Sequence, residues 1–269
     1  VAINQWEQAA DSMYTLCGKD RIHPSTDGHL VMAYLFLKAQ GLAGKLVADI
    51  RIDGAGKKVT RSDNCRVSDL SVSSDNLTFT YEAKSLPYPI DTSYYDNEKH
   101  TQADALSVIP FMDEMNYEGL SVSGLSDGYY GLTIGGEFIG RFTARELERG
   151  INMALLQNTP QYKQAMKIRQ MNEERWLKER KMREFYWVEY NLMRKTGMLW
   201  ACNEAAVDTL RKYRPHDIFL QWNGDLWLQY MHKGIREDCV NEQQDLVNQI
   251  YEQNKPIPLR IEIKKFTDL

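Results

Sequence analysis

The chain has 269 residues, of which 43% are hydrophobic and 26% are charged, and its formal net charge is -4 at pH 7. A chain of this length can build a hydrophobic core without the help of disulfides or metals. The acidic balance argues against a nucleic-acid-binding protein, because phosphate recognition needs a basic surface. No apolar run approaches the roughly 18 residues of a membrane span, so we expect no membrane-spanning segment.

The first residues indicate an amphipathic helix, because Ile3, Trp6, Ala10 and Met13 recur at helical spacing. They contain neither the basic n-region nor the apolar h-region of a signal peptide. The chain has no initial Met and starts within this helical pattern. We therefore expect it to be the C-terminal portion of a longer protein.

Residues 19–29 contain a compact group of polar side chains. Asp20 and His23 lie three positions apart, and Pro24 fixes the backbone directly after the histidine. Ser25 or Thr26 is expected to cap a helix that continues to about Gln40. Because its residues are apolar nearly all round, this helix is expected to be buried.

Beyond residue 45 the hydrophobic pattern changes from helical to alternating, which is typical of half-buried strands. We predict a small antiparallel β module over residues 46–142, with tight turns at Asp127-Gly128 and Gly135-Gly136. The predicted strands are Leu46–Asp53, Val67–Val72, Leu77–Tyr81, Leu120–Leu125, Tyr129–Ile134 and Glu137–Phe142.

From residue 143 the pattern is helical almost to the end. Thr143 and Glu146 fit a capping box, and Pro160 is expected to begin a long helix that reaches about Lys195. Further helices are predicted over Asn203–Tyr213, Asp217–Lys233 and Asn241–Gln253. The alternating tail, Pro258–Phe266, is expected to form a final strand or an extended arm.

Asp20 and His23 are the candidate catalytic residues. In a hydrolase the histidine accepts a proton from the attacking group, while the carboxylate holds the ring in the productive tautomer. An aspartate three residues before a histidine can reach back to Nδ1 within one turn of chain. The alternative is structural, with Asp20 capping a turn and His23 partly buried at the start of the helix.

The pattern Asp-x-x-His-Pro, followed by Gly28-His29 and an apolar helix, resembles the last conserved block of the SGNH (GDSL-type) esterase and lipase family. The resemblance covers about the first 45 residues. It implies a serine ester hydrolase with a three-layer, flavodoxin-like α/β catalytic fold, in which His23 is the general base and Asp20 its partner. Residues 1–45 would then end the catalytic domain, 46–142 form the β module and 143–269 a helical extension.

The family's Gly-Asp-Ser nucleophile block and its oxyanion-hole Gly and Asn are absent from this chain. We therefore expect an upstream segment of the same protein to supply the nucleophile, and this chain alone to be inactive. The resemblance also implies an ester substrate, with an acylated carbohydrate as one option, and a secreted protein, periplasmic or extracellular. It implies no cofactor.

A second motif matches a catalytic pattern in sequence but not in its predicted structural context. Gly124-Leu-Ser-Asp-Gly128 matches the G-x-S-x-G nucleophile elbow, but an elbow needs a helix after the serine, and Tyr129–Ile134 alternates as a strand. We therefore predict a β-turn here.

The rival function is a non-catalytic module that binds carbohydrate or protein. The tyrosines of the β region could stack against sugar rings, although tyrosines on strands are more often core or interface residues. These are Tyr88, Tyr94, Tyr95, Tyr129 and Tyr130.

The four cysteines, at 17, 65, 202 and 239, have no zinc-ligand spacing, so no metal site is expected. Most are expected to be small buried hydrophobic residues, with a Cys202–Cys239 disulfide as an alternative in an exported protein.

Overall fold

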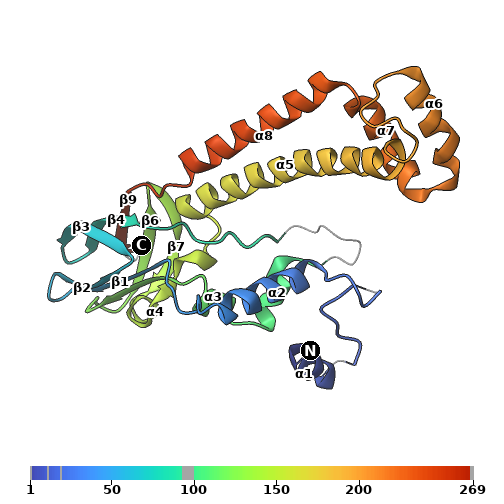
Figure 1. Ribbon diagram of the computed structural model, residues 1–269. Coiled ribbons are helices and arrows are strands. Elements are labelled where there is room, and N and C mark those ends of the chain that lie inside the picture. The colour runs from blue at the N-terminus through green and yellow to red at the C-terminus, as the bar shows by residue number, and fades with distance from the viewer. Residues whose placement is uncertain (1, 11, 19, 93–99, 267–269) are drawn as a thin grey trace. The chain divides into compact units, whose positions relative to one another are not determined.

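The computed structural model describes residues 2–10, 12–18, 20–92 and 100–266. The protein is mixed α/β, with two sheets and a helical C-terminal region (Figure 1). It divides into two compact units. Unit 1 comprises Val1–Met166 together with Lys255–Leu269, and unit 2 comprises Lys167–Asn254. Unit 2 is therefore inserted between the body of unit 1 and its last strand.

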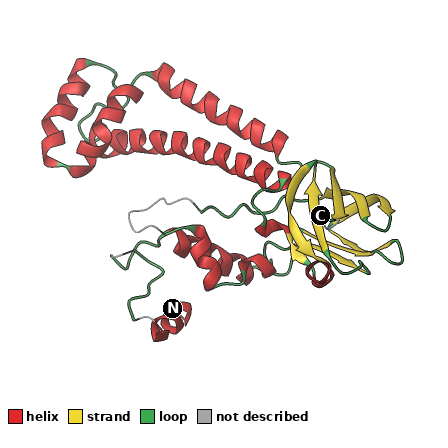
Figure 2. Ribbon diagram, turned by 180° about the vertical axis from the view of Figure 1, so that it is seen from behind, coloured by secondary structure: helices red, strands yellow, loops and turns green. Residues whose placement is uncertain are grey.

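The strands of unit 1 form two sheets, drawn in yellow in Figure 2. The first sheet has the order β2-β1-β5-β8, and its strands are β1 (Ala48–Asp53), β2 (Lys58–Asp63), β5 (Glu118–Ser123) and β8 (Ile151–Asn152). The second sheet has the order β3-β4-β9-β6-β7, and its strands are β3 (Cys65–Val72), β4 (Asn76–Ala83), β6 (Tyr129–Ile134), β7 (Glu137–Thr143) and β9 (Leu259–Lys265).

One hydrophobic core joins the two sheets. Alternate residues of β1 and β5 from the first sheet and of β4, β6 and β9 from the second are buried in the same cluster, among them Ile50, Leu120, Phe79, Leu132 and Ile261. This is the arrangement of a β sandwich, in which each inward-facing residue packs against the opposite sheet. The alternation seen in the sequence is therefore that of sandwich strands.

Two features of the predicted β module are wrong. The module is not wholly antiparallel, because β1 and β5 pair in parallel. Its Asp127-Gly128 turn does not close a hairpin either, since β5 and β6 belong to different sheets. The prediction assumed that neighbouring strands in the sequence pair with each other. The Gly135-Gly136 hairpin is confirmed, with both glycines at positive φ (59° and 85°) between the antiparallel strands β6 and β7.

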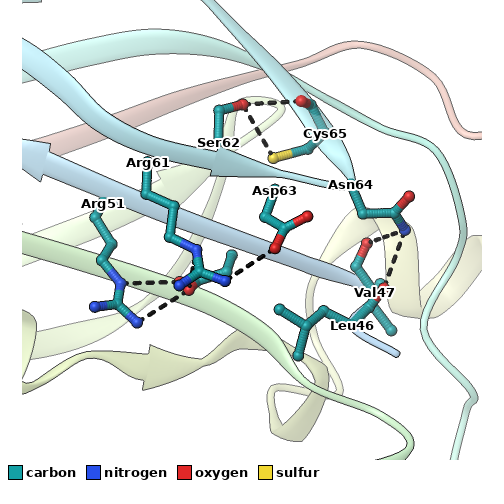
Figure 3. Close-up of polar contacts among 9 residues, drawn as sticks. Leu46, Val47, Arg51, Arg61, Ser62, Asp63, Asn64 and Cys65 are labelled. Carbon is teal, nitrogen blue, oxygen red and sulfur yellow. Dashed lines mark hydrogen bonds and ion pairs between the residues drawn. The ribbon is translucent and has the colours of Figure 1, made fainter. Parts of the chain in front are cut away.

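The alternation also missed β2, an edge strand whose residues are almost all exposed. The chain then passes from the first sheet to the second at Asn64, which has a positive φ of 53°. The Asn64 Nδ2 atom donates to the carbonyl oxygens of Leu46 and Val47, both at 3.0 Å (Figure 3). The left-handed backbone, which asparagine tolerates well, and these two bonds fix the corner between the sheets.

The first sheet also buries a carboxylate near this corner. Asp49 is buried, and its Oδ2 lies 2.9 Å from the Nε of Arg61 and 3.1 Å from an Nη of Arg51. The guanidinium of Arg61 also forms an ion pair with the carboxylate of Asp63, at 2.9 Å (Figure 3). The two arginines neutralise the buried charge, as a buried carboxylate requires.

The helices of unit 1 include α2, which begins directly after the candidate residues. Leu30, Val31 and Tyr34 of α2 pack with Ile109 and Phe111 in a separate small core. The prediction that α2 is buried all round is wrong, because its other side exposes Met32, Leu35 and Phe36. The helical segments of unit 1 are α1 (Ala2–Ala10), α2 (Thr26–Ala39), η1 (Gln102–Ser107), α3 (Phe111–Glu114), α4 (Ala144–Arg149) and η2 (Met153–Leu155).

The long helix α5 (Pro160–Val188) begins in unit 1 and continues into unit 2. Its α-helical part ends at Val188, and a π-helical turn, η3 (Glu189–Met193), continues the helix to within two residues of the predicted end at about Lys195. The other helices of unit 2 are α6 (Glu204–Tyr213), η4 (Arg214–His216), α7 (Ile218–Tyr230) and α8 (Lys233–Gln253). Side chains from α5 to α8 share one core around Phe185 and Trp227.

Two helix starts in unit 2 follow from side-chain caps. The Oδ1 of Asn203 accepts from the backbone N–H of Ala206 at 3.0 Å, and the Oδ1 of Asp217 accepts from that of Phe219 at 2.8 Å. In the charged middle of α5 the expected i,i+4 pairs are present, as between Arg180 and Glu184 at 2.7 Å.

Candidate functional site

A tight loop between Cys17 and Pro24 carries the candidate pair. An isolated β-bridge joins these two residues, and the N–H of Gly18 donates to the carbonyl of His23 at 2.8 Å. At the tip the N–H of Arg21 donates to the carbonyl of Gly18 at 2.8 Å, and Arg21 has a positive φ of 55°. These contacts close the base of the loop and fix the backbone positions of Asp20 and His23.

Within this loop the two side chains meet as the spacing predicted. Asp20 Oδ2 lies 2.5 Å from His23 Nδ1, while Oδ1 accepts from the backbone N–H groups of Ile22 at 2.9 Å and His23 at 3.0 Å. The hydrogen bond to the imidazole, helped by the two backbone donors, lowers the pKa of Asp20 to about 2. The carboxylate is thus ionised at neutral pH, and it favours the tautomer of His23 that carries a proton on Nδ1.

The imidazole of His23 faces solvent, since its side chain is 83% exposed. No hydroxyl or thiol of the described residues hydrogen-bonds to this ring. The geometry provides a base whose Nε2 is open to a reactant, with the carboxylate behind it. The alternative of a partly buried histidine at the start of the helix does not describe this exposed ring.

A second carboxylate–imidazole contact, which the sequence pattern did not predict, lies at the start of α2. Asp27 is buried, its Oδ2 lies 3.3 Å from Nδ1 of His100, and its Oδ1 accepts from the Ser25 hydroxyl at 2.6 Å. Ser25 therefore binds Asp27 and does not cap the helix with its side chain. Nothing local in the sequence signals this contact, because the histidine comes from a distant segment.

Gly28 allows α2 to approach the loop. A Cβ atom at this position would lie 1.9 Å from the carbonyl oxygen of Leu16, far inside any normal contact. The N–H of Ser25 also donates to this carbonyl, at 3.3 Å. The glycine that formed part of the sequence pattern is therefore required by a close approach of two backbone segments.

The G-x-S-x-G segment connects β5 to β6 and is not a nucleophile elbow, but its residues form bends and not the predicted β-turn. Tyr129 begins β6 directly after Gly128, and no helix follows Ser126. The hydroxyl of Ser126 contacts the Tyr130 hydroxyl at 3.1 Å and the Lys265 ammonium at 2.8 Å. It has no histidine partner and no nucleophile-elbow geometry.

Of the tyrosines considered for sugar binding, the structure describes three, and one of these is buried in the core. Tyr130 is 1% exposed and belongs to the core, whereas Tyr129 is exposed and stacks on the guanidinium of Arg141 at 3.7 Å from the ring centroid. Tyr88 packs edge-on against Phe111. Tyr94 and Tyr95 lie outside the described residues.

All four cysteines are free, so the alternative of a Cys202–Cys239 disulfide is wrong; Cys65 and Cys239 are buried. The described part of the chain holds no group of three or more His, Cys, Asp or Glu side chains arranged to bind a metal ion. None of the helices in this part combines the length and apolar character needed to cross a bilayer.

Two comparisons with known proteins find similarity to proteins described as acting on diltiazem. Residues 166–255 match the family described as the diltiazem deacetylase C-terminal helical domain. The solved structure of BT4096, a gut microbial diltiazem-metabolizing enzyme, is similar over 99% of this chain, with 42% sequence identity and a TM-score of 0.93. The chain spans 60% of the length of that protein. A comparison with curated proteins finds no match.

These findings overturn the resemblance to the SGNH (GDSL-type) family. That resemblance rested on a short block around Asp20 and His23, which specifies a turn and a helix start that unrelated folds can build. The match over nearly the whole chain leads instead to a diltiazem-metabolizing enzyme. The flavodoxin-like catalytic fold is not confirmed. Secretion and an acylated-carbohydrate substrate were implied only by that resemblance, and both stay predictions.

Proposed function

We propose that this chain is part of a hydrolase that removes acetyl groups from esters, with His23 as general base and acid and Asp20 as its orienting carboxylate. Two findings support the proposal. One is the similarity of 99% of the chain to an enzyme that metabolizes diltiazem, together with the match of residues 166–255 to a deacetylase family. The other, which carries the assignment of residues, is the 2.5 Å contact between Asp20 and the exposed ring of His23.

In the proposed reaction Nε2 of His23 takes the proton of an attacking hydroxyl as its oxygen bonds to the acetyl carbon. When the tetrahedral intermediate collapses, the C–O bond to the alcohol breaks and the imidazolium returns the proton to the leaving oxygen. Water, deprotonated in turn by Nε2, then attacks the acetyl carbon, the bond to the acetylated hydroxyl breaks, and that hydroxyl regains its proton from the imidazolium as acetate leaves. Asp20 keeps Nδ1 protonated and stabilises the imidazolium between these steps. The low pKa of Asp20, about 2, keeps it ionised throughout.

The test is the hydrolysis of p-nitrophenyl acetate and the release of acetate from diltiazem by the complete gene product. His23→Ala is expected to lower kcat/KM about 10³-fold, because general acid–base catalysis is lost. Asp20→Asn is expected to lower it on the order of 10²-fold, since the amide no longer selects the productive tautomer.

His29→Ala is the matched control. His29 is also exposed and lies on the first turns of α2, six positions after His23. This variant should keep the activity of the unmodified protein. The proposal fails if the unmodified protein is inert toward both esters, or if His23→Ala retains the activity that His29→Ala retains.

A further inference from the structure

Unit 2 contains a pocket that the proposed hydrolase chemistry does not use. It has a volume of about 370 Å³ and lies where η3, the end of α6, η4 and the start of α7 meet. Pockets of this size typically hold small molecules, mostly against apolar and aromatic side chains with a few polar groups that fix orientation. All of its lining residues belong to unit 2.

The apolar part of the lining is suited to a flat ring. Leu192 and Leu220 are buried members of the unit 2 core, so they form the closed side of the pocket. Trp187 and Tyr213 add two aromatic side chains to the lining. Aromatic faces and edges favour another aromatic ring over an aliphatic chain of the same area.

The ionisable side chains of the lining are one lysine, one aspartate and one histidine. The ammonium of Lys195 forms no ion pair with any described residue, and the ring of His216 forms no hydrogen bond within the described part of the chain. The carboxylate of Asp217 is engaged, because its Oδ1 accepts from the N–H groups of Phe219 at 2.8 Å and Leu220 at 3.2 Å. These helix N-terminal donors offset its negative charge.

A second pocket of about 270 Å³ shares Trp187 and provides a contrast. Its two arginines already have partners, Arg180 at 2.7 Å from Glu184 and Arg183 at 3.2 Å from Glu179. Only the first pocket, among these two, therefore presents a cation whose charge is still free for a ligand.

We propose that the pocket at Lys195 binds a small aromatic carboxylate. The ring lies against Trp187 and Tyr213, the carboxylate accepts from the Lys195 ammonium, and an N–H of His216 serves as a second donor. Charge-assisted hydrogen bonds of this kind give both affinity and orientation. The inference does not depend on the proposed hydrolase activity, because no residue of the pocket belongs to the Asp20–His23 site.

Isothermal titration of the complete gene product with 2-naphthoate tests this inference, with neutral 2-naphthamide as the matched ligand. The carboxylate is expected to bind, and the amide to bind at least about tenfold more weakly. Lys195→Gln should weaken 2-naphthoate about tenfold and leave the amide unchanged. Tyr213→Leu should weaken both ligands, because it removes the aromatic contact.

Lys181→Gln is the control variant, since Lys181 is an exposed lysine of α5 that lines neither pocket. Its affinity for 2-naphthoate should equal that of the unmodified protein, and circular dichroism should show that every variant is folded. The inference is overturned if 2-naphthoate does not bind, if the amide binds equally well, or if Lys195→Gln has the affinity of Lys181→Gln.

Discussion

Among the residues whose burial is described, the β-rich unit 1 and the helical unit 2 each bury one glutamate almost completely, Glu118 in β5 and Glu189 in the π turn η3. In unit 2 both oxygens of Glu189 have donors, the indole Nε1 of Trp227 and the backbone N–H of Trp200, each at 2.8 Å. In unit 1 only one oxygen of Glu118 is bound: its Oε1 accepts from the Tyr81 hydroxyl at 2.8 Å and from Gln161 at 3.2 Å, and its Oε2 has no partner.

The difference shows two ways in which a protein interior accommodates a carboxyl group. The helical unit supplies enough N–H donors to replace the water that the carboxylate has lost. The sandwich does not, so burial raises the pKa of Glu118 to about 7 and favours the neutral acid. The exposed Asp20 is a third case, in which hydrogen bonds without burial lower the pKa.

The largest expected effect on stability is that of Glu189→Gln. The glutamine amide has only one oxygen, so its NH₂ group must face one of the two N–H donors, that of Trp227 or that of Trp200. Two donors then face each other, and neither has an acceptor. We expect a loss of about 3 kcal/mol or more in the free energy of unfolding. Urea unfolding followed by tryptophan fluorescence measures it, because every tryptophan except Trp6 lies in unit 2.

Glu179→Gln serves as the control for that experiment, since Glu179 is half-exposed on α5 and, among the described residues, forms an ion pair with Arg183 alone. It should change the unfolding free energy by less than about 1 kcal/mol. A loss for Glu189→Gln no larger than this would show that the two donors do not hold the carboxylate, and the contrast with Glu118 would disappear.

Glu118→Gln should have the opposite sign, and its effect depends on pH. Because the folded pKa of about 7 lies above the ordinary value of 4.5, the folded protein binds the extra proton between these values. The free energy of unfolding of the unmodified protein then falls as pH rises from 4.5 to 7 and is level above that. The neutral amide escapes this loss, so at pH 8 the variant should be more stable by up to roughly 3 kcal/mol.

Thermal unfolding at pH 4.5 and at pH 8, followed by far-ultraviolet circular dichroism, tests this sign. Glu82→Gln is the control, because Glu82 follows Tyr81 on β4 but is only half-buried and is paired with Arg66. If Glu118→Gln destabilises the protein equally at both pH values, Glu118 is not a neutral acid in the fold.

Some of these contacts could be predicted from the sequence and others could not. The contact of Asp20 with His23 was predictable because both residues belong to one turn of chain. The strands β4, β5 and β6 were predictable because their core residues alternate. The contact between Asp27 and His100 and the partners of Glu118 involve segments that only the folded chain brings together.

The strands likewise could be predicted from local sequence, whereas their pairing partners could not. The tail was expected as a strand or an arm, and it is β9, yet its position between β4 and β6 depends on contacts with residues far earlier in the chain. Polar, exposed β2 had no alternation to reveal it, because an edge strand with no buried face needs none. Local periodicity therefore predicted elements, and long-range packing decided their partners.

The smallest expected effect on stability is that of Asp20→Asn, which sharpens the distinction between a buried and an exposed carboxyl group. Asp20 loses little solvent on folding, and its hydrogen bonds lie within one exposed loop. Its lowered pKa contributes stability that is present at neutral pH and lost only as pH falls toward about 2. Water replaces most of what the substitution removes, so the unfolding midpoint at pH 7 should stay within experimental error of the unmodified protein's.

The same variant should lose most of its ester hydrolysis. A fall in stability as large as that of Glu189→Gln would instead make Asp20 a structural residue, and the loss of activity could then be explained by unfolding of the loop.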